Sequence, residues 1–121
     1  MSVHVTVETF YIEAQSDLAA ERFVFAYTIT IDNQSSQAVQ LLRRYWKITD
    51  ANGKVTEVQG DGVVGEQPHL KPNERYTYTS GAVLETPVGT MQGHYDMVCA
   101  DHSELVVPIP LFRLAKPGVL N

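Results

Sequence analysis

Apolar and polar residues alternate along most of the chain with the period of two that is typical of β-strands. The alternation is clearest over residues 23–31, and five residues of that segment share one face: Phe23, Phe25, Tyr27, Ile29 and Ile31. We expect this strand to lie at the centre of a sheet. Weaker patterns predict further strands over residues 3–13, 38–49, 54–58, 74–80, 90–100 and 104–114. Only residues 14–22 are compatible with a helix, and a short one.

Residues that favour turns separate the predicted strands. Residues 32–36 form one such cluster, and Asn52-Gly53 predicts a hairpin between the strands on either side. Ser80-Gly81 predicts another turn. About seven short strands joined by turns predict an all-β fold, an immunoglobulin or fibronectin type III-like antiparallel β-sandwich, with a barrel as the alternative. A length of 121 residues fits a single domain, residues 1–121.

The patterns of two predicted strands carry more detail. Strict alternation divides residues 38–49 into two faces: Leu42, Arg44, Trp46 and Ile48 on one, and Val39, Leu41, Arg43, Tyr45 and Lys47 on the other. We expect Trp46 to anchor the core. In the last strand, Pro108 and Pro110 cannot donate hydrogen bonds to a neighbouring strand, which indicates an edge strand or a bulge.

Charge and cysteine content restrict the classes of partner and the compartment. The formal net charge is −5 and the pI about 5.2, so the surface repels polyanions, and we expect no nucleic-acid partner. Cys99 is the single cysteine and cannot form an intrachain disulfide, which favours a reducing, cytoplasmic location. The start of the chain lacks the pattern of a signal peptide, and the apolar run 105–112 is too short for a membrane span, so we expect no membrane insertion.

A glycine motif is the first candidate site. Gly60, Gly62 and Gly65 match G-x-G-x-x-G, the pattern that brings backbone close to a pyrophosphate at a helix N-terminus. Two prolines over residues 66–72 argue against a helix there. One interpretation is therefore a connection that needs positive φ angles. The other is a ligand-binding loop in which backbone N–H groups hold an anion and Arg43 or Arg44 supplies charge.

Metal-binding and catalytic patterns are weak. Cys99 and His102 form C-x-x-H with His94 and Asp96 nearby, but the chain offers no second ligand pair at matching spacing. Alternation also puts Cys99 on the strand face opposite His94 and Asp96, so we expect a small buried side chain and no metal or cofactor. The chain contains no nucleophile-elbow or cysteine-protease signature, so no catalytic residue is assigned, and the prediction is a domain that is not an enzyme.

Several segments together resemble the ApaG family. They are residues 58–68 (Val-Gln-Gly-Asp-Gly-Val-Val-Gly-Glu-Gln-Pro), 78–81 (Tyr-Thr-Ser-Gly), 89–97 (Gly-Thr-Met-Gln-Gly-His-Tyr-Asp-Met), 43–46 (Arg-Arg-Tyr-Trp) and 50–53 (Asp-Ala-Asn-Gly). The resemblance covers nearly the whole chain and implies a fibronectin type III or immunoglobulin-like sandwich. It also implies an association with cobalt and magnesium efflux or resistance, and a suggested pyrophosphate site at Gly60, Gly62 and Gly65.

Related domains in eukaryotic F-box proteins resemble protein-interaction modules, and this favours binding over catalysis. We therefore expect a protein partner, contacted through an exposed sheet face or through residues 59–68. A dense set of aromatic residues supports this expectation, because tyrosine and tryptophan are enriched at interfaces. The alternative is binding of a nucleotide or polyphosphate by the glycine motif with Arg43 or Arg44. A homodimer through an unpaired edge strand stays open.

Overall fold

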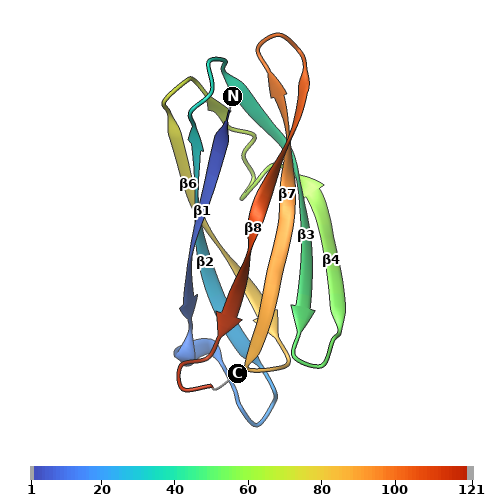
Figure 1. Ribbon diagram of the computed structural model, residues 1–121. Coiled ribbons are helices and arrows are strands. Elements are labelled where there is room, and N and C mark those ends of the chain that lie inside the picture. The colour runs from blue at the N-terminus through green and yellow to red at the C-terminus, as the bar shows by residue number, and fades with distance from the viewer. Residues whose placement is uncertain (1, 120–121) are drawn as a thin grey trace.

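Two antiparallel β-sheets pack face to face in the computed structural model, which describes residues 2–119 (Figure 1). The elements are β1 (Val3–Tyr11), the 3-10 helix η1 (Glu13–Gln15), β2 (Phe23–Asn33), β3 (Val39–Asp50), β4 (Val55–Asp61), β5 (His69–Leu70), β6 (Arg75–Leu84), β7 (Val88–Cys99) and β8 (Glu104–Ala115). One sheet has the order β1-β2-β6. The other has the order β4-β3-β7-β8, and β5 pairs with β3. This arrangement confirms the predicted fibronectin type III-like sandwich.

The strand pattern of the sequence is largely confirmed. β2 is the central strand of its sheet, as the alternation over residues 23–31 predicts. Asp50 accepts hydrogen bonds from the backbone N–H groups of Asn52 and Lys54 in the β3–β4 hairpin, where Gly53 has a φ of +83°. Residues 14–22 contain only the end of η1 and a turn. Within residues 2–119, no helix has the length and apolar character needed to cross a bilayer.

The turn predicted at Ser80-Gly81 is wrong. Both residues lie inside β6, where Ser80 pairs with Tyr27 and Gly81 with Ala26 of β2. The strand continues because Leu84 pairs with Phe23 and is buried, so the hydrophobic face of β6 extends beyond the glycine. An edge strand tolerates a glycine that a local turn rule interprets as a stop.

β3 also departs from strict alternation. The register with β7 shifts between Leu41 and Arg43, so Leu42 is the extra residue of a β-bulge. The bulge changes the phase of the strand, and Leu41 and Trp46 both point into the core, whereas unbroken alternation puts them on opposite faces. The Leu42 carbonyl accepts hydrogen bonds from the Gly62 N–H at 2.8 Å and from Gln67 Nε2 at 3.0 Å.

The core lies between the sheets, and aromatic side chains form its middle. Trp46 is only 3% exposed, which confirms it as a core anchor. Its ring meets those of Tyr27 and Phe112 at centroid distances of 5.4 and 5.7 Å in edge-to-face geometry. Burial of an aromatic side chain of this size stabilises the fold by roughly 2–3 kcal/mol.

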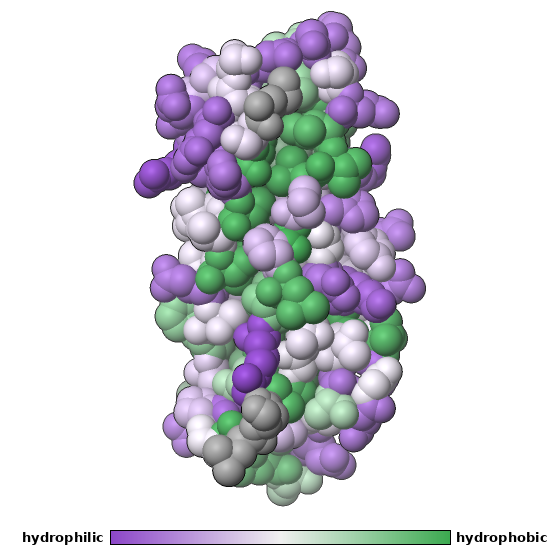
Figure 2. Space-filling model, in the orientation of Figure 1, coloured by the Kyte–Doolittle hydropathy of each residue, from purple (hydrophilic) through white to green (hydrophobic). Residues whose placement is uncertain are grey.

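The two long sides of the sandwich differ. β1 and β8 contact each other on one side, where Figure 2 shows a band of apolar side chains along their seam. β8 is an edge strand, and the register with β7 shifts at Pro110 and Leu111, so both predictions from Pro108 and Pro110 are confirmed. β6 and β4 form the edges of their sheets on the other side, and that side carries the candidate sites.

Candidate functional site

The glycine motif begins inside a strand, not in a loop. Gly60 belongs to β4 and pairs with Arg44 of β3, so both residues face the inside of the sandwich. A Cβ atom on Gly60 would lie 2.8 Å from Arg44 Nη1. The same Nη1 donates hydrogen bonds to the carbonyl oxygens of Asp61 (3.1 Å) and Gly62 (3.0 Å). Glycine at position 60 therefore makes room for the guanidinium.

The other two glycines shape a tight turn. Val63 and Glu66 exchange backbone hydrogen bonds of 2.8 and 2.9 Å. Between them, Val64 and Gly65 have φ angles of 44° and 81°, the two positive values that a type I′ turn requires. A Cβ atom on Gly62 would lie 2.2 Å from the Glu66 carbonyl oxygen. After Gly65 the chain continues toward β5, so the geometry of a dinucleotide fingerprint, with a helix that opens after the glycines, does not form.

The turn uses most of its own donors. The N–H of Gly62 bonds to the Leu42 carbonyl, and the N–H groups of Val63 and Glu66 bond to each other's carbonyls. An anion-binding nest needs such groups free and pointing at the ligand. The Glu66 side chain also adds negative charge beside the turn.

The two predicted arginines point to opposite faces of the sheet. Arg44 faces inward and reaches the turn, together with Gly60, Gly62 and Gly65. Arg43 faces outward, where its Nε lies 3.4 Å from Asp96 Oδ2. The structure therefore brings four of the five predicted ligand-binding residues together and separates Arg43 from them.

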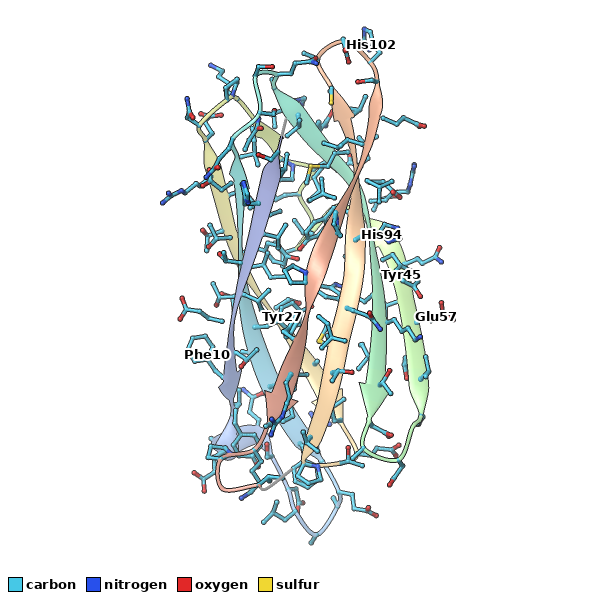
Figure 3. The ribbon with its side chains drawn as sticks, in the orientation of Figure 1. Phe10, Tyr27, Tyr45, Glu57, His94 and His102 are labelled. Atoms are coloured by element: carbon cyan, nitrogen blue, oxygen red, sulfur yellow. The ribbon has the colours of Figure 1, made fainter. Side chains whose placement is uncertain are left out.

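Arg43 belongs to a polar cluster on the outer face of β3, β4 and β7. Tyr45 stacks on His94 at a centroid distance of 5.1 Å, and its hydroxyl donates to Glu57 Oε2 at 2.6 Å (Figure 3). The hydrogen bond to Glu57 raises the pKa of the Tyr45 hydroxyl. A shallow hollow of about 450 Å³ lies over this cluster.

The residues considered for metal binding are spread apart. His94 Nε2 lies 3.8 Å from Asp96 Oδ1 on the outer face, whereas Cys99 is buried on the opposite face of β7. His102 lies in the β7–β8 turn with a φ of 69°. Among residues 2–119, His, Cys, Asp and Glu form no group of three or more with a metal-binding arrangement.

A groove follows the open side of the sandwich between β4 and β6. Three hollows of about 310, 230 and 120 Å³ follow one another along β6 from Tyr78 to Glu85. Arg44, Trp46 and Ile48 of β3 form the floor of the groove. Val58 of β4 and Val83 of β6 lie along its two long edges. The Val63–Glu66 turn closes one end, and the ion pair of Lys54 with Glu85 (2.9 Å) lies at the other.

Buried tyrosine hydroxyls surround the Arg44 end of this groove. Tyr78 and Tyr95 share a hydrogen bond between their hydroxyls. Burial raises the pKa values of Tyr27, Tyr78 and Tyr95, and the nearby Arg44 charge opposes that rise in all three. The phenols therefore stay neutral at neutral pH, and Arg44 is the cation at this end of the groove, where Asp61 also lines the hollow.

Sequence reasoning missed the groove because it depends on two strands from different sheets. One local signal was present: residues 76–84 contain neither a charged residue nor a proline. That run is unusual for an edge strand, but nothing in the sequence of this segment indicates that it forms an edge.

Comparisons with known proteins agree with the fold and cover nearly the whole chain. A model of the ApaG domain family matches residues 13–99. The ApaG protein of an Enterobacter species (strain 638) is 61% identical over 119 residues, 98% of this chain and 95% of that protein. The ApaG protein of Erwinia tasmaniensis is 62% identical over 113 residues, 93% of this chain and 90% of that protein.

A solved structure gives the same result in three dimensions. The crystal structure of a protein from Bordetella pertussis, described as ApaA, superposes with a TM-score of 0.94 at 45% identity and covers 98% of this chain and 96% of that one. Sequence and structure agree over almost the full length of these relatives. The chain therefore belongs to the ApaG family.

Proposed function

We propose that this chain is a non-enzymatic, cytoplasmic protein-binding domain that contacts its partner along the open side between β4 and β6. The observation that carries the proposal is the exposure of apolar side chains on the rim of the groove. Val58, Val64 and Val83 are 36, 54 and 52% exposed. Exposed apolar residues that gather around a groove are typical of interaction sites.

The packing of the sandwich does not need these side chains to be apolar. Val83 points away from the core, because the buried neighbours Tyr78 and Leu84 occupy the opposite face of β6. Val64 lies in a type I′ turn, where β-branched residues adopt a positive φ at a cost. A binding role gives a reason for valine at both positions.

Photo-crosslinking tests this proposal. Benzoylphenylalanine at Val58 is expected to capture a discrete protein from a cell lysate, because Val58 lines the groove from the inward face of β4. The matched control carries the same probe at Phe10, which is 46% exposed on the outer face of β1. Capture at neither position, or equal capture at both, would contradict a protein site on the open side.

The family's association with cobalt and magnesium efflux belongs to the same proposal. We propose that the association acts through the protein partner rather than through a metal held by this chain. The separation of Cys99 and His102 from the His94–Asp96 pair supports this choice. Crosslinked partners from cells grown with and without excess cobalt would check it, and the expected result is a transport-related protein.

Nucleotide or polyphosphate binding is the second candidate, and one observation favours it. The Arg44 guanidinium lies beside Gly60 and Gly62, so a positive charge is present at the glycine motif. An isotope-labelled sample titrated with ATP and with diadenosine tetraphosphate tests it through the amide shifts of Gly60, Gly62 and Gly65. Saturable shifts confined to these amides support the candidate, and unchanged shifts at millimolar nucleotide exclude it.

A further inference from the structure

The free edge of β6 lacks the features that normally protect edge strands. β6 is the last strand of its sheet and pairs only with β2 among the described elements. Residues 76–84 contain no charged side chain and no proline, and no bulge interrupts the register with β2. An unprotected edge of this kind offers a row of free N–H and C=O groups to another strand.

The other three edges are protected. β8 carries Pro108, Pro110 and a bulge. β1 contacts β8, so these two edges close one side of the sandwich. β4 carries Glu57 and Asp61. The contrast within one molecule indicates that the edge of β6 is kept available.

Strand β4 covers the space beside the free edge of β6. Thr56, Val58 and Gly60 pair with the inward-facing residues of β3, so their side of β4 also faces inward. Because β1 and β8 meet at the opposite side, the fourth strand of the larger sheet has no strand of the smaller sheet below it. Neighbouring strands lie about 4.8 Å apart and packed sheets about 10 Å apart. The space below β4 therefore fits one strand.

We propose that β6 accepts one extended segment of a partner protein as a fourth strand of the β1-β2-β6 sheet. The constant-type immunoglobulin sandwich has a strand of its own in the corresponding place. Addition of a strand to an exposed sheet edge is a known mode of peptide recognition. The inference rests on the proposed protein-binding function and specifies its mechanism.

A second copy of this chain cannot occupy the space through its own β6 edge. Antiparallel pairing of two β6 strands relates the copies by a two-fold axis perpendicular to the sheet. The β3–β4 layer of each copy would then overlap with β4 of the other, because β4 already covers the place beside β6. The occupant is a single extended segment and not the edge of another sandwich.

The groove determines the chemistry of that segment. Its inward side chains would lie against Trp46, Ile48 and Val58, which favours apolar, β-branched residues. Near Ser80 the segment would meet the half-buried Arg44, whose guanidinium has donors beyond the Nη1 atom that bonds to the turn. We expect a carboxylate at this inward position. The stretch from Tyr78 to Leu84 accepts an extended segment of roughly 20–25 Å.

A fused probe tests the mechanism in the full chain. The probe alternates valine and threonine, has a central glutamate on the valine face, and follows Asn121 through a flexible glycine-serine linker that gives a millimolar effective concentration. Hydrogen exchange is then measured for each amide of β6. We expect every second amide between Tyr78 and Leu84 to become at least 10-fold more protected, because β2 already protects the others.

Two matched changes refine the test. A probe with lysine in place of the glutamate is expected to lose most of the added protection, because it faces Arg44. In the chain, Val83→Lys is expected to reduce protection about 10-fold by placing a charge on the edge. Phe10→Lys, on the outer face of β1, serves as the control and leaves it unchanged.

The outcomes separate the mechanism from the proposed function. If alternate amides of β6 gain no protection, strand addition is overturned. If the glutamate and lysine probes give equal protection, the proposed contact of a carboxylate with Arg44 is overturned. If crosslinking at Val58 still captures a partner in that case, the protein-binding function stands and only the mechanism fails. If crosslinking fails as well, both proposals fall.

Discussion

Arg44 is a charged side chain on the inner face of a sheet, and its contacts explain why the sandwich tolerates it. Its position at the open side leaves the side chain half-buried, and Nη1 bonds to the carbonyls of Asp61 and Gly62. Charged groups in such positions need hydrogen-bond partners to offset the loss of water. Gly60 permits this arrangement because any side chain there would meet the guanidinium.

Alanine substitution of two glycines separates steric contact from backbone strain. Both Gly62 and Gly65 have positive φ angles, but a Cβ atom would meet the Glu66 carbonyl oxygen only at Gly62. We expect Gly65→Ala to lower the free energy of unfolding by about 1 kcal/mol through the left-handed conformation alone. Gly62→Ala is expected to cost about 3 kcal/mol. Urea unfolding measures both, and equal losses would contradict the contact.

The buried tyrosine pair predicts a loss of stability at alkaline pH. The pKa of Tyr78 is raised by burial from its ordinary value of 10.0, so the folded state holds the phenol proton more tightly than the unfolded state does. The resulting stabilisation is complete below about pH 10 and is lost as the pH rises further. Above that pH, each such tyrosine lowers the free energy of unfolding by about 1.4 kcal/mol per pH unit.

Tyr78→Phe tests this prediction. We expect the free energy of unfolding to fall less steeply above pH 10, and to be lower by about 1–2 kcal/mol at neutral pH because Tyr95 loses its hydroxyl partner. Urea unfolding at a series of pH values measures both effects. Tyr45→Phe is the control. Tyr45 lies on the outer polar face, where solvent screens the phenolate that forms at alkaline pH. An unchanged slope in Tyr78→Phe would refute the assignment.

At the scale of elements, the bulge in β3 and the glycine turn form one unit. The Leu42 carbonyl, at the bulge, faces the β4 side of β3, and the Gly62 N–H and Gln67 Nε2 both bond to it. An unpaired carbonyl would otherwise weaken the strand at this point. The turn thereby stabilises the bulge that brings Leu41 and Trp46 into the same core.

Gln67→Ala tests the coupling between these elements. Loss of the Nε2 donor is expected to lower the free energy of unfolding by about 1 kcal/mol. The Gly62 amide, which bonds to the same carbonyl, is expected to exchange faster with solvent. Hydrogen exchange and urea unfolding measure the two effects. Glu66→Ala is the neighbouring control, and a similar response there would show that the effect belongs to the whole turn.

The elements also show how far sequence patterns reach. The segments 23–31 and 90–100 predicted β2 and β7 because their alternation is regular and hydrophobic. The turn at Ser80-Gly81 was wrong, because a local turn rule does not include the pairing of β6 with β2. The prediction that Leu41 shares a face with Arg43 and not with Trp46 was wrong for a similar reason, since the position of a bulge depends on the neighbouring strand.

At the scale of the whole molecule, the two sheets share one core without a covalent cross-link. Cys99 is a free, buried cysteine. The core extends from residues near Cys99 through Trp46 to the far end of the sheets. A continuous core of this kind in a chain of 121 residues predicts cooperative unfolding as a single domain.

Two probes at different positions in the core test this cooperativity. Trp46 fluorescence follows the middle of the sandwich, and thiol labelling of Cys99 follows the end of β7. We expect both signals to change at the same urea concentration, with slow labelling of the folded protein because Cys99 is buried. Separate midpoints would show that the sandwich opens in parts.

The candidate sites also belong to this scale. Gly60, Gly62, Gly65 and Arg44 were identified from the sequence, and the structure brings them together at one turn. Arg43 does not join them, because adjacent residues of a strand point to opposite faces. No pattern in the sequence predicted the groove beside β6, since its floor comes from β3 and its two long edges come from β4 and β6.

The all-β class, the position of most strands and the core role of Trp46 follow from the sequence, because alternation and turn chemistry act between near neighbours along the chain. Only the folded molecule shows that β6 and β4 are edge strands, where β3 bulges and that Arg44 lies beside an unpaired strand covered by β4. These features depend on contacts between residues distant in sequence, and a pattern read along one strand contains no information about its missing neighbour.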